Sequence, residues 1–262
     1  MERHKALYAL CKICNKIGIE VRSGQLTFEL AMVDFGSYFI YAGILVYFHG
    51  DFRTEKRKFF FFFYFHIFVF VGLSMWNLFN KTVSGSVRIV AANRAVVTKV
   101  YIPKYFLIII LLFQNLFKMM ISFGIVIVMM LWSHVPVSYN VIYVIPIFAD
   151  LILITFGVSA ILAHFGVFFD DLKNITNVGL RILFYMSGIF YVITDRVNEA
   201  IATLLLKVNP VGFLIDACRS SLVYCETPHR RLILLWFVIG SVLSAIGVAI
   251  IYKNENNYVK VI

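Results

Sequence analysis

Long apolar runs constrain the fold of this chain more than any other feature. Several stretches carry few or no charges over the roughly 20 residues that a helix needs to cross ~30 Å of hydrocarbon. Hydrophobic residues make up 61% of the sequence, well above their share in soluble domains. The runs are continuous instead of alternating, which argues against a β-barrel. The sequence therefore predicts an all-α polytopic membrane protein.

Six apolar runs predict six transmembrane helices in one transmembrane domain, residues 26–262. Their approximate ranges are 27–48, 59–79, 105–132, 140–165, 175–193 and 232–252. Six spans place both termini on one side of the membrane. The segments on that side hold more Lys and Arg than the opposite segments, and such an excess marks the cytoplasmic face. We therefore expect both termini in the cytoplasm.

The N-terminal segment, residues 1–25, has the pattern of an amphipathic helix that lies in the membrane interface. Apolar residues recur at three- and four-residue spacing, and the lysines Lys5, Lys12 and Lys16 fall on the opposite face. A basic face beside an apolar face is typical of a monotopic helix. The alternative is a cytosolic helix packed on a partner, and both can hold together.

The formal net charge of +10 does not indicate nucleic-acid binding in this chain. Its basic residues gather at the ends of spans, where anionic headgroups attract them. Cys11 and Cys14 form a lone CxxC. Because zinc would need two further ligands, we interpret them as small apolar residues on a helix.

The third predicted span carries a polar stripe. Gln114, Lys118 and Ser122 are four residues apart, and a lysine deep in a span is costly unless it is paired or functional. Asp150 in the fourth span lies at a comparable expected depth. We predict a Lys118–Asp150 pair, which either holds the helices together or belongs to a substrate pathway.

Two connections between spans have unusual compositions. The polar segment 80–104 predicts a short helix over 84–101, with Ser84 or Ser86 as its N-cap, that is suited to docking a cytosolic partner. The long segment Phe184–Tyr224 is apolar and interrupted by Asn209-Pro210. We predict two short re-entrant helices over 195–225, hinged at this dipeptide, so a tag near Asn209 should report the outer side.

The last predicted span has small residues spaced for close helix packing. Gly240 with Ser244, and Ala245 with Ala249, each form a small-xxx-small pair.

The sequence lacks the motifs of several enzyme classes. It contains no GxxxxGK[ST] phosphate-binding loop, no HExxH and no GxSxG. We therefore predict a non-enzymatic transport subunit that is powered by another protein.

Three segments resemble those of a known family. They are Asn93-Arg94 followed by Thr98–Lys104, Asp170-Asp171-Leu172 ahead of Tyr185–Tyr191, and Asn209-Pro210-Val211 with Ile215 and Arg219. Their order and spacing are similar to the membrane subunit of type-2 ABC exporters, within the polysaccharide, O-antigen and teichoic-acid export group. In that family Ser-Pro often stands where this chain has Ser187-Gly188.

The resemblance implies an assembly and a location. It implies a homodimer with two cytosolic ATPase subunits, which bind ATP and Mg while this chain holds no cofactor, in the bacterial inner membrane. Residues 84–101 would resemble the coupling helix, and 195–225 the outer gate helices. The implied ATPase-coupling residues are Val87, Asn93, Arg94, Lys99 and Pro103, and the implied outer-gate residues are Asn209, Pro210 and Arg219.

Aromatic residues suggest how a sugar polymer would be held. Sugars stack on aromatic rings while their hydroxyls need polar partners, and tyrosine supplies both. We assign Tyr38, Tyr41, Tyr185 and Tyr191, with Lys118, to the substrate pathway. The alternative is that these tyrosines are amphipathic anchors at the membrane interface.

The function that fits these features best is export of a lipid-linked polysaccharide or polyol-phosphate polymer. One alternative keeps the same fold and exports a drug or a lipid. Another is a secondary transporter or membrane scaffold without an ATPase, in which Lys118 and Asp150 serve ion coupling.

Overall fold

The computed structural model describes residues 55–94, 103–132, 138–189 and 208–261. The chain divides into two compact units, Met1–Phe62 and Phe63–Ile262. The predicted interfacial helix 1–25 and the first predicted span, 27–48, both lie outside the described residues.

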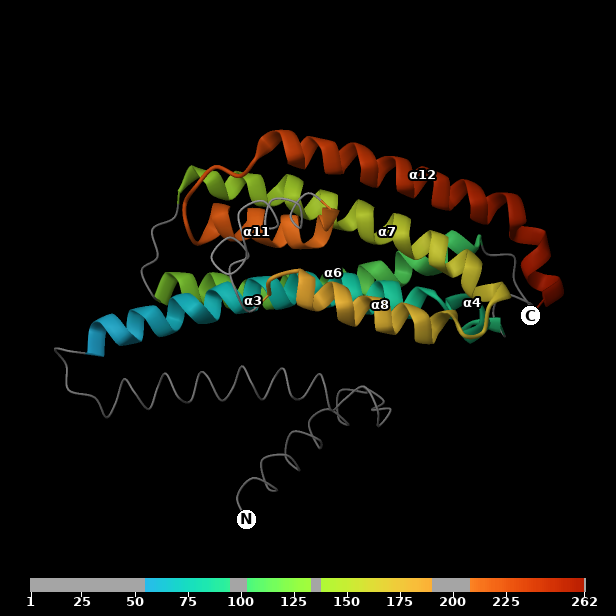
Figure 1. The fold of residues 1–262 in the computed structure, drawn as a ribbon, viewed down its shortest axis with the longest axis horizontal. Helices are drawn as coiled ribbons and strands as arrows, with labels where there is room; N and C mark the ends of the chain where they lie inside the picture. Colours follow the sequence, from blue (N-terminus) through green and yellow to red (C-terminus); the bar gives the residue numbers. More distant parts are fainter. Residues whose placement is uncertain (1–54, 95–102, 133–137, 190–207, 262) are drawn as a thin grey trace, which may run out of the picture. The chain divides into compact units, whose positions relative to one another are not determined.

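Every regular element in the described ranges is helical. The elements are α3 (Glu55–Ser86), α4 (Ile89–Ala92), α6 (Lys104–Trp132), the 3-10 helix η1 (Tyr139–Tyr143), α7 (Val144–Phe168), α8 (Leu172–Met186), α11 (Pro210–Leu222) and α12 (Arg230–Val261) (Figure 1). Three stretches in these ranges are long and apolar enough to cross a membrane: Lys104–Trp132, Tyr139–Phe168 and Arg230–Asn254. They match the third, fourth and sixth predicted spans, and the prediction of an all-helical membrane protein is confirmed to this extent.

Two helices differ in length from their predicted spans. The second span lies within α3, which continues as a helix to Ser86. The fifth was expected to reach residue 193, but α8 ends at Met186. The reason is Gly188, whose φ of 60° is the left-handed conformation that commonly ends a helix. The chain therefore leaves the helix well before the expected position.

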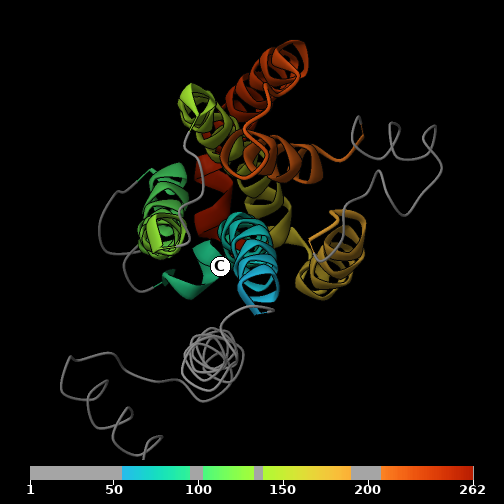
Figure 2. The same cartoon turned by 90° about the vertical axis from the view of Figure 1, so that its left-hand side faces the viewer.

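Helices α7 and α12 run parallel in close contact (Figures 1 and 2). A Cβ added at Gly157 would lie 2.8 Å from the backbone nitrogen of Ser244, and one at Gly240 3.1 Å from Ile154. The Ser244 hydroxyl also donates to the Leu153 carbonyl at 2.9 Å. Small residues thus let the two backbones approach, as the sequence predicts.

Only one of the two small-residue pairs of α12 faces α7. Gly240 and Ser244 are buried, whereas Ala245 and Ala249 are exposed. Gly247 takes the place expected for the second pair, because a Cβ there would lie 2.6 Å from Ala160 Cβ. Spacings of four and three residues keep Gly240, Ser244 and Gly247 on one helix face.

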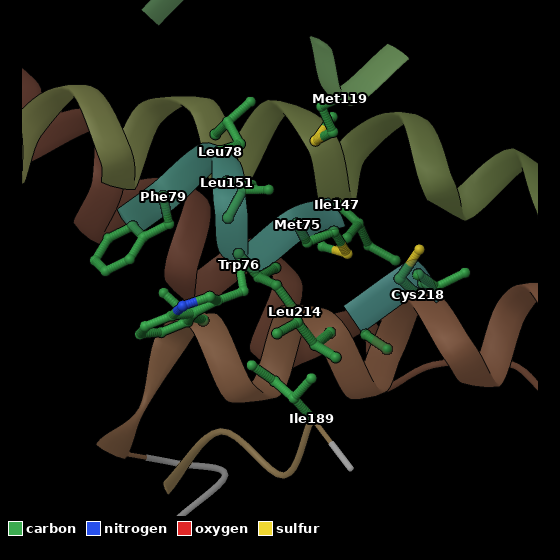
Figure 3. Close-up of a cluster of buried hydrophobic side chains, with 14 of the residues drawn as sticks. Met75, Trp76, Leu78, Phe79, Met119, Ile147, Leu151, Ile189, Leu214 and Cys218 are labelled. Carbon is green, nitrogen blue, oxygen red and sulfur yellow. The ribbon is translucent and has the colours of Figure 1, made fainter. Parts of the chain in front are cut away.

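The main core joins six of the described helices. It collects buried apolar side chains chiefly of α3, α6, α7 and α11, with Met75, Met119, Leu151 and Leu214 among them (Figure 3), and one each from α8 and α12, Leu180 and Ile233. A second buried cluster lies where α4, the start of α6 and the ends of α7 and α12 meet. We call the end of the bundle where α7 and α12 begin the α11 end, and the end where they finish the α4 end.

We expect the α7–α12 contact to be intolerant of added volume. Gly157→Ala should lower the melting temperature of the purified chain, because its Cβ meets the α12 backbone and overpacking costs about 1–3 kcal/mol. Gly124→Ala in α6 is the matched control, since nothing lies within 4 Å of its added Cβ. Equal melting temperatures for the two variants would contradict this close packing.

Candidate functional site

Asn209 and Pro210 begin α11 and attach it to α8. The Asn209 side-chain oxygen accepts from the Gly212 N–H at 3.2 Å, and Pro210 occupies the first turn, where its missing N–H is harmless. The Asn209 amide also donates to the Ser187 hydroxyl at 3.0 Å, and this hydroxyl donates to the Leu183 carbonyl. One residue therefore caps α11 and fixes its start beside the end of α8.

Arg219 holds the other end of α11 through three backbone carbonyls. Arg219 is 2% exposed. It donates to Phe68 at 3.0 Å, to Gly188 at 2.9 Å and to Ile189 at 2.7 Å. Its Cζ lies 3.6 Å from the Phe68 ring centroid. Carbonyl dipoles and an aromatic face together compensate a charge that would be very costly to bury alone.

A glycine in α3 makes room for this guanidinium. A Cβ at Gly72 would overlap Arg219 Nη2, so the helix surface must be bare at that position. Arg219 thereby joins α11 to α3 and to the turn after α8. We call the set Phe68, Gly72, Gly188, Ile189 and Arg219 the Arg219 clamp.

The clamped helix is short and largely buried. Its 13 residues extend about 20 Å, less than the ~30 Å of a hydrocarbon core. Ten of these residues are buried. Just after the end of α11, the Cys225 carbonyl accepts a hydrogen bond from the Asn140 amide of η1 at 2.7 Å. α11 is therefore an internal element of the α11 end, with contacts to α7 and η1.

The described residues predicted to couple to an ATPase gather at the α4 end. Val87 is buried against Gly166 of α7, where a Cβ would overlap the Val87 carbonyl. Asn93 is half-buried and donates to the Ile89 carbonyl at 2.8 Å, which closes α4. Arg94 is exposed, and Pro103 precedes the first turn of α6. Lys99 lies outside the described residues.

Residues 84–94, the described part of the predicted helix 84–101, do not form one helix. Ser84 and Ser86 belong to the last turn of α3, and α4 covers Ile89–Ala92 only. Neither serine caps α4: Ser84 donates to Asn177 at 2.9 Å, and Ser86 donates to the Val83 carbonyl. Both hydroxyls are thus already used, because α3 extends further than expected.

The predicted Lys118–Asp150 pair is wrong. Asp150 is fully buried, and neither of its carboxylate oxygens has a hydrogen-bond partner in the described residues. Lys118 is exposed. It precedes the buried Met119 by one position, which turns its side chain about 100° away from the core. The inward polar residue of α6 is Asn115, which donates to Thr82 of α3 at 3.0 Å.

The predicted substrate-pathway residues are not brought together in the described ranges. Tyr185 is 73% exposed on α8. Tyr38, Tyr41 and Tyr191 lie outside the described residues, and Lys118 is on α6. No group of three or more His, Cys, Asp or Glu side chains that could hold a metal ion occurs in these ranges.

Sequence reasoning missed the partners of the Asn209-Pro210 dipeptide and of Arg219. Ser187 and Gly188 were noted for their type, and the signal for Gly72 was a lone glycine inside an apolar span. Nothing in the sequence pairs Gly72 with Arg219, because 147 positions of chain separate them. The contact requires the three-dimensional placement of α11.

Comparison with curated proteins supports the resemblance noted in the sequence. An O-antigen export system permease protein RfbA of Klebsiella pneumoniae is 22% identical over 192 residues, 73% of each chain, and so is a second RfbA of that organism. The RfbA of Myxococcus xanthus is 26% identical over 151 residues, 57% of this chain and 58% of its own. The resemblance to type-2 ABC exporter permeases is confirmed. No protein-family model matches the chain.

This resemblance fits the described fold at a coarse level. The relatives are named as permeases, and this chain has helices able to span a membrane. The chain is therefore a membrane protein similar to polysaccharide-export permeases.

We expect the Arg219 clamp to be a main source of stability. Arg219→Met should destabilise the purified chain by on the order of 3 kcal/mol, because three buried carbonyls lose a charged donor. Arg219→Lys should also destabilise it, since an ammonium lacks the planar fork. Thermal unfolding followed by tryptophan fluorescence measures both.

Arg231→Met is the matched control for these two variants. Arg231 is exposed at the start of α12, and its loss should leave the melting temperature within about a degree of the parent value, since surface substitutions have small effects. If Arg219→Met melts at the same temperature as Arg231→Met, the clamp does not stabilise the fold.

Proposed function

We propose that this chain is the membrane subunit of an ATP-driven exporter that moves a lipid-linked polysaccharide or polyol-phosphate polymer across the bacterial inner membrane. The observation that carries the proposal is its similarity to O-antigen export permeases over 73% of both chains. The described helices fit a conduit subunit, with a short buried helix at one end and a connection that exposes two arginines at the other.

The α4 end is where we place the ATPase partner. Arg88 and Arg94 are exposed there, whereas Ile89 and Val90 are buried against α6 and α7. The Arg88 side chain also donates to the Asp170 carbonyl at 3.0 Å, which links this connection to the turn before α8. The segment thus presents basic side chains on a base fixed to the bundle, as a contact surface for a cytosolic subunit needs. The partner binds ATP and Mg.

The α11 end is where we place the outer gate. A helix shorter than the membrane, buried on most sides and fixed at both ends, suits a re-entrant element that closes a pathway. We extend this role to residues 195–209, with the Arg219 clamp holding α11 in place. Six spans from one chain leave little room for a polymer, so two copies form the conduit between them. Tyr185, exposed on α8, is available to that conduit.

We expect both termini in the cytoplasm and residues 1–25 in the membrane interface. The secondary-transporter alternative assigned ion coupling to Lys118 and Asp150, and in the described residues the Asp150 carboxylate forms no hydrogen bond with Lys118.

Purification of the chain with its neighbouring gene products tests the function directly. We expect an ATPase to co-purify in equal amount. Arg94→Ala combined with Lys99→Ala should reduce the retained ATPase by roughly tenfold, which corresponds to about 1.4 kcal/mol of binding free energy. Arg231→Ala, at the α11 end, should retain the parent amount.

Either of two results would contradict the proposed function. One is that no ATPase accompanies the parent chain. The other is that the Arg94→Ala/Lys99→Ala variant retains as much ATPase, and exports as much cell-surface polymer, as Arg231→Ala does.

A further inference from the structure

The last turns of α12 are packed into the bundle. The last predicted span ends at residue 252, but α12 continues to Val261. Tyr258 in this extension is 1% exposed. Its hydroxyl lies 2.6 Å from His164 Nδ1 of α7, and its ring centroid lies 6.1 Å from that of Phe168. A side chain this enclosed fixes the end of α12 against the end of α7.

The same side chain belongs to the cluster that supports α4. Tyr258 and Ile251 of α12 share this buried cluster with Ile89 and Val90 of α4. The cluster is completed by residues of α6 and α7: Leu107, Ile108, Ala160 and Ala163. The C-terminal turns of α12 are therefore part of the base on which α4 rests.

This buried cluster matters because α4 is too short to be stable as an isolated helix. It has four residues, and isolated helices shorter than about 12 residues are marginal in water. No side chain caps its N-terminus. Its conformation and position must therefore come from its neighbours: the Val87–Gly166 approach, the Arg88–Asp170 hydrogen bond and the buried cluster.

We propose that Tyr258 is a positioning residue that holds residues 87–94 in place for the ATPase. This inference rests on the proposed function for its purpose, but its structural content is separate. Tyr258 touches no ATPase or polymer. It acts through its contact with His164 and by packing in the buried cluster that contains Ile89 and Val90.

α7 and α12 also connect α4 with the opposite end of the bundle. α7 contacts α4 at one end and α11 at the other. Tyr258 fastens α12 to α7 at the α4 end, and the Gly157, Gly240 and Gly247 contacts fasten the two helices further along. These contacts therefore link α4 to α11 through the α7–α12 pair.

A spin label on α4 tests the positioning role without any ATPase. The background replaces Cys11, Cys14 and Cys225 with serine and keeps Cys218, which is buried. A nitroxide is attached at Ala92→Cys, because Ala92 is exposed on α4. The full chain is reconstituted in lipid vesicles, and the mobile fraction of the label is read from its continuous-wave spectrum.

Tyr258→Ala should raise the mobile fraction at least twofold. Tyr252→Ala is the matched control, since Tyr252 lies on the same helix and is 71% exposed, and it should leave the spectrum unchanged. Tyr258→Phe keeps the ring and loses only the hydroxyl, so it guards against a variant that fails to fold. It should give a smaller rise than Tyr258→Ala, in the same direction.

The inference is overturned if neither Tyr258 variant differs from Tyr252→Ala. Adding the co-purified ATPase separates this result from the proposed function. If Tyr258→Ala mobilises the label and also loses ATPase at least fivefold relative to Tyr252→Ala, both stand. An ATPase that binds Tyr258→Ala as tightly as Tyr252→Ala overturns the positioning role, and a parent chain that binds no ATPase overturns the proposed function itself.

Discussion

The arrangement of the α11 end depends on one buried cation. The Arg219 guanidinium is removed from solvent and from lipid, and three backbone carbonyls from α3 and from the turn after α8 must surround it. This requirement explains a bare glycine in α3, an early end to α8 and the burial of α11. A charge that is costly to leave unpaired thus specifies where a short helix sits. Apolar packing alone would fix α11 much less narrowly.

α7 connects this end of the bundle to the other. It contacts α11 and η1 near its start, α4 near its finish, and α12 along its length. Small residues bring α12 close, and Tyr258 closes the contact at the α4 end. A subunit that converts work at one membrane face into opening at the other needs a stiff element between the two. The α7–α12 pair has the geometry for that role.

The sequence predicted the features that follow from local pattern. Apolar run length located α6, α7 and α12, and Asn209-Pro210 marked the start of α11, because a capping side chain and a proline act within one turn. It did not predict contacts made across the fold. Lys118 and Asp150 were matched by depth alone. Lys118 lies one position before the buried Met119 on α6, so its side chain points away from the core in which Asp150 lies. Gly72 carried only the signal of a lone glycine inside an apolar span and Tyr258 carried none, since their importance comes from Arg219 and His164 on other helices.

We propose that α11 and α4 lie at opposite faces of the membrane. Single cysteines at Val208, exposed before α11, and at Ala92, exposed on α4, report this directly in spheroplasts treated with a membrane-impermeant maleimide. We expect Val208→Cys to be labelled in intact spheroplasts, and Ala92→Cys to be labelled only after permeabilisation. Labelling of both from the same side, or of Val208→Cys only after permeabilisation, would contradict this proposal.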